Sequence, residues 1–462
     1  MTHSITQQMV DLPRLRTPAL LNAAEYWLAP ERFARRCESL GDRFLVAMPA
    51  SRPWLCLTHP DDIKRVFSAD TGVLRLGAAL AKNSPHPLVL GPTGLTNVDG
   101  DEHMRSRKMQ LPPFRARALA EYENVMERKT EDALARWPYG RPTRADSHMQ
   151  AISLEVIIAV VFGVTDPDRV ERLRAATLAL MRVGNSRRFF VQTMIVTARN
   201  KGWDGPFPRI RAAMAAVDAI VLEEAAERRH RGDPDQDDVL GMFLRAHDAN
   251  SKPIPDSELC DAMRTLLLGG HETTASTLAW ILERVTRHPD ELARLEAAAL
   301  AGDDDYIDAV IKETMRLRPV FPITGRLAAE DFALGDLTIP AGTLIIPHIT
   351  LVHRRPDLYP DPLTFRPQRF LDSRAGTYTW IPFGGGARRC IGAAFSLVEM
   401  RIVLRTMLRH ARLLPTNRRA ERVARHTVTI APARGATVTL KRRPPFAHLD
   451  EPGTTHLHAP VV

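Results

Sequence analysis

Cysteine is scarce in this chain of 462 residues: it occurs four times, at widely separated positions. No two of the cysteines form a Cys-x-x-Cys pair, so the spacing expected of a structural zinc site is absent. The scatter also differs from the closely spaced cysteines of a small secreted disulfide scaffold. The sequence therefore favours a protein of a reducing compartment, and we expect a cytoplasmic location.

Long hydrophobic runs are also missing. The longest one, residues 156–164, has nine residues, whereas a membrane-spanning helix needs about 20. Residues 1–20 are polar, contain proline and lack the apolar core of a signal peptide. We expect a protein without a membrane span or a targeting leader.

The positive charge is not gathered into a basic block. The formal net charge is +9 and is spread along the chain, whereas a nucleic-acid-binding protein more often concentrates its basic residues. We therefore expect no nucleic-acid partner. The basic residues form either a solvated surface or a docking face for an acidic protein. The apolar content of 44% and the charged content of 25% are those of an ordinary globular protein.

The pattern of apolar residues predicts a mainly helical protein with a small β part. Helical periodicity dominates residues 100–285, and a long, mostly apolar helix is expected over 256–287. Short strand patterns at 43–47 and 54–58, and strand pairs with turns at 335–336 and 340–342, are too few for a parallel sheet. Residues 71–100 are rich in Gly and Pro and predict a long loop, which in a compact protein is often functional.

The two ends of the chain differ from the rest. Residues 1–20 predict an extended arm, and residues 441–462 have the composition of a disordered tail. No internal repeat or low-complexity tract divides residues 21–440. We expect this central part to be a single domain.

One cysteine, Cys390, stands in a special context: glycines and arginines precede it and a helical pattern follows it. The free N–H groups and the positive end of that helix favour the thiolate, which is a soft metal ligand. The glycines let the backbone approach something flat and bulky, and Arg388 offers a planar fork for a carboxylate. The alternative is a buried free cysteine after a Gly-rich turn.

A second unusual string, residues 269–274, places Gly-Gly-His-Glu-Thr-Thr in the middle of the long helix. Two glycines inside a helix cost about 1 kcal/mol each relative to alanine, and a neighbouring hydroxyl can bond back to the helix and bend it. The functional interpretation is a groove over a bound ligand, with an acid and an alcohol beside it, and with Thr274 facing elsewhere. The alternative is a helix end followed by a new start. A zinc site is excluded because Ala275 stands where the second His would be.

The string 383–392 fits Phe-x-x-Gly-x-Arg-x-Cys-x-Gly and resembles the heme-ligand loop of the cytochrome P450 monooxygenases, with five fixed positions in ten residues. The string 269–274 resembles the acid–alcohol motif of the same family, whose helix opens to seat dioxygen. The resemblance implies the cytochrome P450 fold, mainly α with small β-sheets, as a single heme domain. It makes Glu272 the acid and Thr273 the alcohol of a proton relay. The positions of the loop that match the family are Phe383, Gly386, Arg388, Cys390 and Gly392.

Two further motifs carry the resemblance. Glu313 and Arg316 lie three apart on one helix face and match the family's Glu-x-x-Arg helix; Arg369 would complete its buried structural cluster. Taken alone, such a pair is usually a surface salt bridge of little value. The family binds its two heme propionates with basic residues at positions that correspond here to His103, Arg107, Arg326 and Arg388. Lone basic residues of this kind would otherwise decorate the surface.

The resemblance implies a heme-thiolate monooxygenase that hydroxylates a hydrophobic small molecule. Heme b would be held by the Cys390 thiolate as the axial iron ligand, which favours O–O cleavage. Electrons would come ultimately from NAD(P)H through a separate reductase and a ferredoxin or flavodoxin, because no such domain follows the heme part. The basic residues expected to flank the docking face are Arg105, Lys108, Arg389 and Arg401. We expect a monomer, and the Arg-rich composition suits a high-GC bacterium.

The substrate itself is not written in these motifs. The expected pocket segments are 71–100, 185–205, 266–274 and 320–324, which are largely apolar and favour a fatty acid, terpene, steroid or polyketide over a sugar or nucleotide. Arg187 and Arg188 are expected on solvated surface, or else meeting a substrate carboxylate. Two alternatives to the monooxygenase remain: a peroxide-driven or isomerase-type enzyme of the same fold, and a non-enzymatic heme sensor. The pair Glu272–Thr273 argues against both, since neither needs a proton relay.

Overall fold

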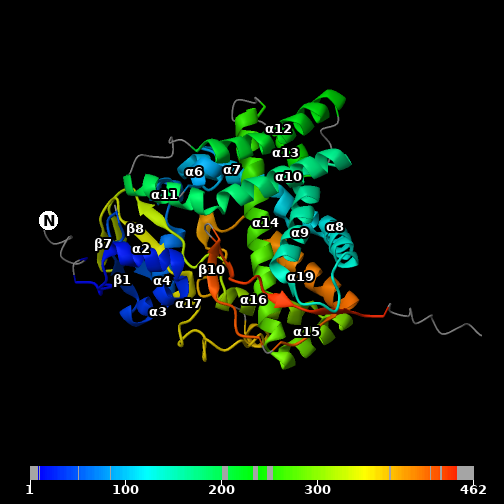
Figure 1. Ribbon diagram of the computed structural model, residues 1–462. Coiled ribbons are helices and arrows are strands. Elements are labelled where there is room, and N and C mark those ends of the chain that lie inside the picture. Colours follow the sequence, from blue (N-terminus) through cyan, green and yellow to red (C-terminus); the bar gives the residue numbers. More distant parts are fainter. Residues whose placement is uncertain are drawn as a thin grey trace, which may run out of the picture.

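A long helix, α14 (Asp256–Thr286), runs through the middle of the molecule in this computed structural model (Figure 1). The structure describes residues 9, 11–49, 51–83, 85–199, 207–232, 238–246, 253–373, 376–416, 418–426 and 429–444. Asp256 and Glu258 lie in the first turn of α14, where their charges suit the positive end of the helix. Most of its side chains after the first turn are buried, so α14 is the axis of the core.

Helices cover α14 on most sides; α9, α12, α16 and α19 pack directly on it. The larger helices of this part are α7 (Gly100–Gln110), α8 (Ala116–Ala135), α9 (Ala145–Ile157), which continues as the π-helix η3 (Ile158–Phe162), α10 (Pro167–Gly184), α11 (Arg187–Arg199), α12 (Pro208–Arg231), α13 (Val239–Arg245), α15 (Pro289–Ala301), α16 (Asp304–Leu317) and α19 (Ala393–His410). The shorter helices are α2 (Ala19–Leu28), α3 (Pro30–Cys37), η1 (Glu38–Leu40), α4 (Pro60–Ser68), α5 (Leu76–Asn83), α6 (His86–Leu90), η2 (Pro112–Phe114), α17 (Ile349–Val352), α18 (Arg369–Asp372) and η4 (Gly386–Arg388).

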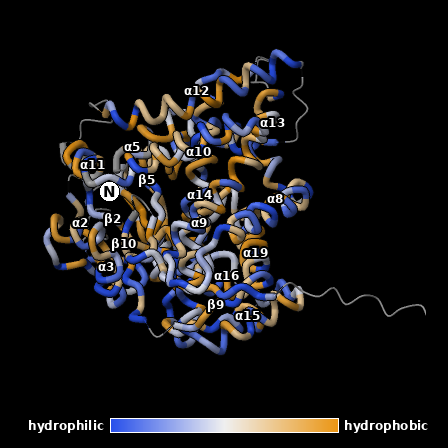
Figure 2. The backbone as a smooth tube through the Cα atoms, turned by 45° about the vertical axis from the view of Figure 1, so that its right-hand side comes forward, coloured by the Kyte–Doolittle hydropathy of each residue, from blue (hydrophilic) through white to orange (hydrophobic). Residues whose placement is uncertain are grey.

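The main sheet lies on one side of the helical body, where β1, β7 and β8 are labelled (Figure 1), whereas β9 lies away from it, near α15 and α16 (Figure 2). The main sheet has the order β1-β2-β8-β5-β3, and its β2–β8 pair is parallel, with Cys56 opposite Ile346. The small sheets pair β6 with β7, β10 with β11, β12 with β4 and β13 with β9. The strands are β1 (Arg43–Val46), β2 (Trp54–Leu57), β3 (Leu74–Arg75), β4 (Thr143–Arg144), β5 (Arg326–Ala328), β6 (Phe332–Leu334), β7 (Leu337–Ile339), β8 (Leu344–Pro347), β9 (Ala411–Leu413), β10 (Val423–His426), β11 (Thr429–Pro432), β12 (Thr437–Val438) and β13 (Leu440–Arg442). The predicted class, mainly α with small sheets, is confirmed.

The prediction of one long loop over residues 71–100 is wrong. This segment contains β3, α5 and α6. The helix α5 forms because the carboxylate of Asp99 accepts hydrogen bonds from three backbone N–H groups of its first turn, those of residues 76–78. A cap supplied from 21 or more positions along the chain cannot be read from local composition.

Three smaller predictions also change. The turn at 340–342 leads into β8, which pairs with β2 and β5 and not with β7. Residues 441–442 lie in β13, so the fold extends into the predicted tail; residues 445–462 lie outside the described part. In the predicted arm, Leu15 exchanges backbone hydrogen bonds with β1, since its N–H donates to the Leu45 carbonyl and the Leu45 N–H donates to the Pro13 carbonyl.

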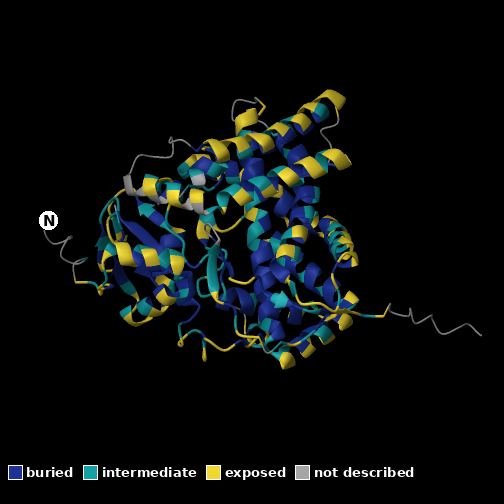
Figure 3. Ribbon diagram, in the orientation of Figure 1, coloured by how far each residue is buried: buried dark blue, intermediate teal, exposed yellow. Residues whose placement is uncertain are grey.

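The apolar interior follows α14 and its neighbours. Hydrophobic residues of α9, α14 and α19 make up much of this interior, while outer helices such as α12 alternate hydrophobic and hydrophilic residues along their length (Figure 2). Burial shows the same division: the lower half of α14 is dark, whereas α10 and α12 expose one face (Figure 3). Within the described residues, one stretch, Ala145–Phe162, has the length and composition of a membrane span, and 67% of it is buried in this core.

Candidate active site

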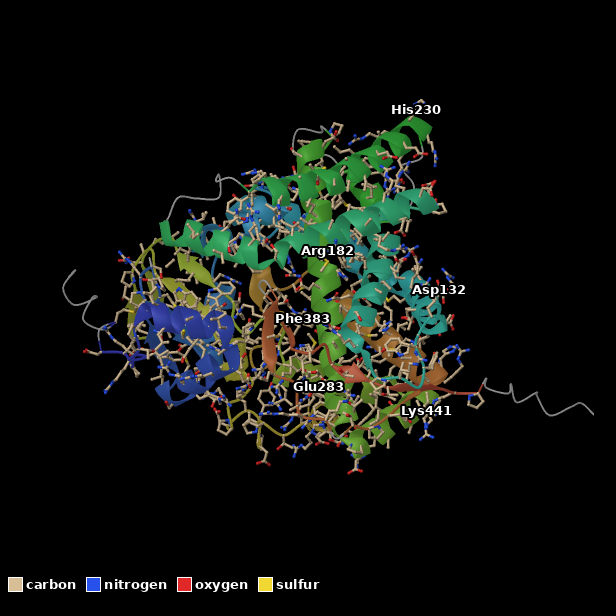
Figure 4. All side chains as sticks on the ribbon, viewed as in Figure 1. Asp132, Arg182, His230, Glu283, Phe383 and Lys441 are labelled. Carbon is tan, nitrogen blue, oxygen red and sulfur yellow. The ribbon has the colours of Figure 1, made fainter. Side chains whose placement is uncertain are left out.

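A cavity of about 900 Å³ lies between α14 and the main sheet. Its walls come from segments far apart in the sequence, including α2, α5, α10, α14, residues 320–326 and the loop before α19. Nine of the site residues expected for a cofactor or for catalysis line it, namely Glu272, Thr273, His103, Arg107, Arg326, Phe383, Arg388, Cys390 and Gly392. Figure 4 shows Phe383 in the middle of the molecule, beside α14. Gly386 is the one predicted loop position that does not line the cavity.

The loop 383–390 is closed on itself before α19 begins. The Cys390 N–H donates to the Phe383 carbonyl at 2.9 Å, which fixes both ends of the loop against each other. Gly386 has φ +64°, and a Cβ there would lie 1.7 Å from the Phe67 carbonyl oxygen; a Cβ on Gly385 would strike the Phe67 ring. These two glycines therefore let the loop press against α4. The sequence interpretation assigned their close approach to a ligand, and the structure assigns it to Phe67.

The Cys390 thiol faces the cavity, unlike the three other cysteines, which are buried. Burial raises the pKa of the Cys390 thiol, while the Gly392 N–H, Arg107 and Arg389 act to lower it. The helix end and two cations thus favour the thiolate as expected, although burial outweighs them in the protein alone. Burial raises the pKa of Cys37 and of Cys260 to about 12, and neither of them lines this cavity.

The Gly-Gly-His-Glu-Thr-Thr string does not end the helix, because α14 continues through it to Thr286. Gly270 packs closely against α9: a Cβ there would lie 2.7 Å from Ile157 Cδ1, so the isoleucine side chain would have to shift. Gly269 has open space beside it and lines the cavity. The Thr273 hydroxyl donates to the Gly269 carbonyl at 2.7 Å. The alcohol therefore sits on the cavity wall and satisfies the carbonyl one turn earlier.

The acid of the pair is tied to a β-strand. The Thr429 hydroxyl on β11 donates to Glu272 Oε1 at 2.9 Å. Burial raises the pKa of Glu272, and the hydrogen bond from Thr429 acts in the opposite direction. The expectation that Thr274 faces elsewhere is wrong: Thr274 lines the cavity, and its hydroxyl has no hydrogen-bond partner among the described residues.

Four basic side chains meet at one wall of the cavity: His103 and Arg107 of α7, Arg326 of β5, and Arg388 of η4. Burial, together with the charges of the three arginines, lowers the pKa of His103 to about 3. Burial also lowers the pKa of Arg326 to about 9 and that of Arg388 to about 10. The basic residues thus repel one another within a buried space.

This basic cluster fits the two propionates of a heme. One acid, Asp99, pairs with Arg388 and offsets part of the charge, and Arg388 also donates to the carbonyls of Leu95 and Val98. The ring nitrogen Nδ1 of His103 is buried and has no hydrogen-bond partner among the described residues. An excess of buried cations and an orphaned polar nitrogen suit a ligand that brings two carboxylates. A thiol facing the same cavity supplies a donor for its iron.

The Glu-x-x-Arg motif forms a second, separate charge cluster that does not line the cavity. Glu313 and Arg316 are fully buried and form two hydrogen bonds of 2.7 and 2.8 Å, and Arg369 Nε donates to Glu313 Oε1 at 3.1 Å. The cluster reaches the cysteine loop through His353. Its Nε2 accepts from the Ile381 N–H at 2.9 Å, while its Nδ1 lies 3.2 Å from the Arg316 carbonyl.

The predicted docking face is only partly free. Arg105 pairs with Glu258 at 2.7 Å, and Arg401 forms two bonds of 2.7 Å with Asp308. Lys108 and Arg389 are exposed. These two, rather than all four, are the better candidates for contact with an acidic partner.

The four predicted pocket segments each contribute to the cavity wall, but two other walls are new. α2 contributes residues including Tyr26 and Trp27, and the β10–β11 pair contributes Arg425 and Thr429. Arg188 is exposed and does not line the cavity, while the side chain of residue 187 lies outside the description. Asp99 and Thr429 are the functional candidates that sequence reasoning missed. Asp99 stands before the helix that carries the basic pair, whereas nothing local distinguishes Thr429.

Comparisons with known proteins give one consistent picture. The family model described as "Cytochrome P450" matches residues 13–438. A protein named cytochrome P450 137 of Mycobacterium tuberculosis is 36% identical over 381 residues, 82% of this chain and 78% of the relative. A protein named cytochrome P450 135B1 of Mycobacterium bovis is 37% identical over 420 residues, 89% of this chain and 87% of the relative. The solved structure "Retinoic acid bound cyanobacterial CYP120A1" superposes with a TM-score of 0.77 at 21% identity, over 94% of this chain and 99% of that one.

Proposed function

Because the chain belongs to the cytochrome P450 family, we propose that it is a heme-thiolate monooxygenase that hydroxylates an apolar small molecule with dioxygen and two external electrons. The observation that carries this proposal is that Cys390, Glu272 and Thr273 all face one cavity. A sensor or a peroxide-driven enzyme needs the cysteine but has no use for an acid and an alcohol beside it.

The residues divide the work between binding and proton delivery. Cys390 would hold the iron, and the cluster of His103, Arg107, Arg326 and Arg388 would hold the two propionates. When bound, heme supplies the activation of dioxygen, and the protein supplies position, dryness and protons. Thr273 offers a hydroxyl at the cavity wall, and Glu272, whose pKa is raised by burial, is suited to hold a proton and pass it on.

The cavity supports an apolar substrate. Apart from the groups assigned to the cofactor and the relay, its described walls are mostly aliphatic and aromatic, including Leu80, Val89, Phe189, Leu266 and Phe321. The volume of about 900 Å³ includes the space beside Cys390 that the heme would fill, so heme and substrate would share it. The retinoic acid named for the cyanobacterial neighbour, a long apolar molecule with one carboxylate, belongs to the class that such a cavity would accept.

Electrons would arrive from a separate acidic protein such as a ferredoxin or flavodoxin. Attraction between opposite surfaces speeds encounter and weakens with salt. The exposed Lys108 lies on α7, the helix that carries His103 and Arg107. Lys108→Glu should slow reduction by a ferredoxin at low salt and leave substrate binding unchanged. Lys441→Glu is the matched control, since Lys441 is exposed on β13, far from α7 (Figure 4).

The test of the function is turnover with a reductase and ferredoxin across a panel of apolar compounds. The proposal predicts a hydroxylated product that requires both reductant and dioxygen. Equal product from added hydrogen peroxide without reductant would support the peroxide-driven alternative. Rearranged product without reductant would indicate an isomerase. Spectral shifts with several ligands and no product from any would favour a sensor.

The relay is tested by Thr273→Ala. The variant should fold and bind substrate, but reductant should then yield hydrogen peroxide in place of product, because groups that transfer protons typically contribute about 100- to 10,000-fold. Thr286→Ala is a matched control: its hydroxyl makes the same bond to the carbonyl four residues earlier on α14, and it does not line the cavity. Unchanged product per reductant in Thr273→Ala would contradict the relay.

A further inference from the structure

The acid Glu272 is not held by its own helix. The described hydrogen bond to its carboxyl group comes from the Thr429 hydroxyl, 2.9 Å from Oε1 and 157 positions further along the chain. Thr429 is 2% exposed, begins β11, and lines the same cavity as Glu272. The strand β11 therefore lies against α14 and contacts the acid at the cavity wall.

Thr429 is fixed in place by its neighbours. The next residue, Ile430, donates its N–H to the Val320 carbonyl at 2.9 Å, and its own carbonyl accepts from Trp280 Nε1 on α14 at 3.4 Å. The strand β11 also pairs in register with β10, with Ala431 opposite Ala424. The hydroxyl thus stands on rigid backbone, which is the condition for holding a partner group in one orientation.

We propose that Thr429 is a positioning residue for the proton relay, which holds the Glu272 carboxyl group on the cavity wall beside Thr273. The role in proton delivery rests on the proposed function, whereas the contact itself does not. The hydroxyl donates to the carboxylate, so it stabilises the charged form of the acid. Without it, Glu272 would turn freely about its side-chain bonds and bind its proton more firmly, and it would deliver that proton less often.

Among the influences on the pKa of Glu272, the hydrogen bond from Thr429 is the one that favours the charged carboxylate. Burial and this hydrogen bond are the influences that move the pKa of Glu272, the first upward and the second downward. The titratable groups on elements packed against this part of α14 do not act on it. They include His271 on α14 itself, Glu155 on α9, Asp218 on α12, Glu399 on α19, Glu313 and Arg316 on α16, Arg425 on β10, and the cavity-lining His103, Arg107, Arg326, Arg388 and Cys390. A change at Thr429 should therefore be read directly in the titration of Glu272.

The experiment is an infrared titration of the heme-loaded, reduced, carbon-monoxide-bound protein, which needs no turnover. The carboxyl band of Glu272 is identified by its loss in Glu272→Gln. We expect its titration midpoint to lie at higher pH in Thr429→Val than in the wild type, and to return in Thr429→Ser, which restores the hydroxyl. Thr429→Ala repeats the test if the valine variant folds poorly.

The control is Thr130→Val. Thr130 is fully buried on α8, where its hydroxyl donates to the Met126 carbonyl at 2.7 Å, and it does not line the cavity. The titration midpoint of Glu272 in Thr130→Val should match that in the wild type. The pH profile of product formed per reductant should shift in Thr429→Val in the same direction as the midpoint. Coincident midpoints for Thr429→Val and the wild type, or a serine variant that behaves like the valine one, would overturn the proposal. Failure of turnover in the wild type would instead refute the monooxygenase function.

Discussion

Two clusters of buried charge in this molecule contain similar residues and differ in balance. In the first, the Glu313 carboxylate accepts from Arg316, from Arg369 and from the Arg366 N–H. A further nitrogen of Arg316, Nη1, donates to the carbonyls of His353 and Pro362 at 2.7 Å each. In the second, His103, Arg107, Arg326 and Arg388 face one another with Asp99 as the acid within reach.

The difference in charge balance indicates which cluster suits a structural role and which suits the binding of a ligand. A buried charge is tolerated where the chain supplies its partners, and the Glu313 cluster is supplied almost completely. The second cluster keeps an excess of cations against a cavity wall, and the charges of neighbouring arginines add to burial in lowering the pKa of His103 and of Arg326. Such a cluster is stable only in company with an external anion. We therefore propose a structural role for the first cluster and a role in binding the cofactor for the second.

The largest effect is expected from breaking the balanced cluster. Glu313→Ala leaves two arginines buried without their carboxylate, and removing one partner of a buried pair typically costs about 3–5 kcal/mol. Urea unfolding should show this loss, and little heme-loaded protein should be recovered. Asp256→Ala, which breaks an exposed pair with Arg229, should cost about 0–1 kcal/mol. A Glu313→Ala protein that keeps its stability and heme and loses only turnover would contradict the structural role.

A smaller and different effect is expected in the unbalanced cluster. Arg326→Leu removes a repelled cation, so the free energy of unfolding of the heme-free protein should stay the same or rise. Heme binding should weaken roughly 10- to 100-fold, the equivalent of one charge-assisted hydrogen bond. Heme titration and unfolding are measured on the same preparations, with Arg326→Lys as the variant that keeps the charge. If Arg326→Leu made the heme-free protein less stable and left its heme affinity unchanged, the second cluster would have a structural role and the proposal would be contradicted.

A different kind of effect, on the pH dependence of stability, concerns a buried carboxyl group on which no cation among the described residues acts. Burial raises the pKa of Glu399 on α19 to about 8, and the Ser153 hydroxyl offsets this only in part. The folded protein keeps the proton that the unfolded chain has lost above its ordinary pKa of 4.5, so this contribution to stability is full below pH 4.5 and is lost as the pH rises to about 8. Glu399→Gln should make the free energy of unfolding less dependent on pH over this range. A slope equal to that of the wild type would show that Glu399 is charged in the folded protein.

The sequence was sufficient where the chemistry is local. The loop around Cys390, the span of α14 and the Glu313–Arg316 helix are each carried by residues a few positions apart, and the structure places them as expected. The four basic residues could be named only through the family resemblance, because they lie on three separate elements.

The rest depends on contacts between distant segments. The helix α5 exists because Asp99 caps it, and Gly386 is needed because α4 lies against it. The bond between Thr429 and Glu272 joins a strand to a helix that lies 157 positions earlier in the sequence. Composition and periodicity report which face of an element is buried, but not which element will lie against it.

The central claim, that one cysteine out of four holds a heme iron, is tested most directly by the carbon monoxide spectrum of the reduced protein. The wild type should show the red-shifted Soret band of a thiolate ligand, and so should Cys37→Ser, Cys56→Ser and Cys260→Ser, whose thiols are buried away from the cavity. Cys390→Ser should lose that band. A thiolate spectrum that persists in Cys390→Ser would contradict the assignment of the site.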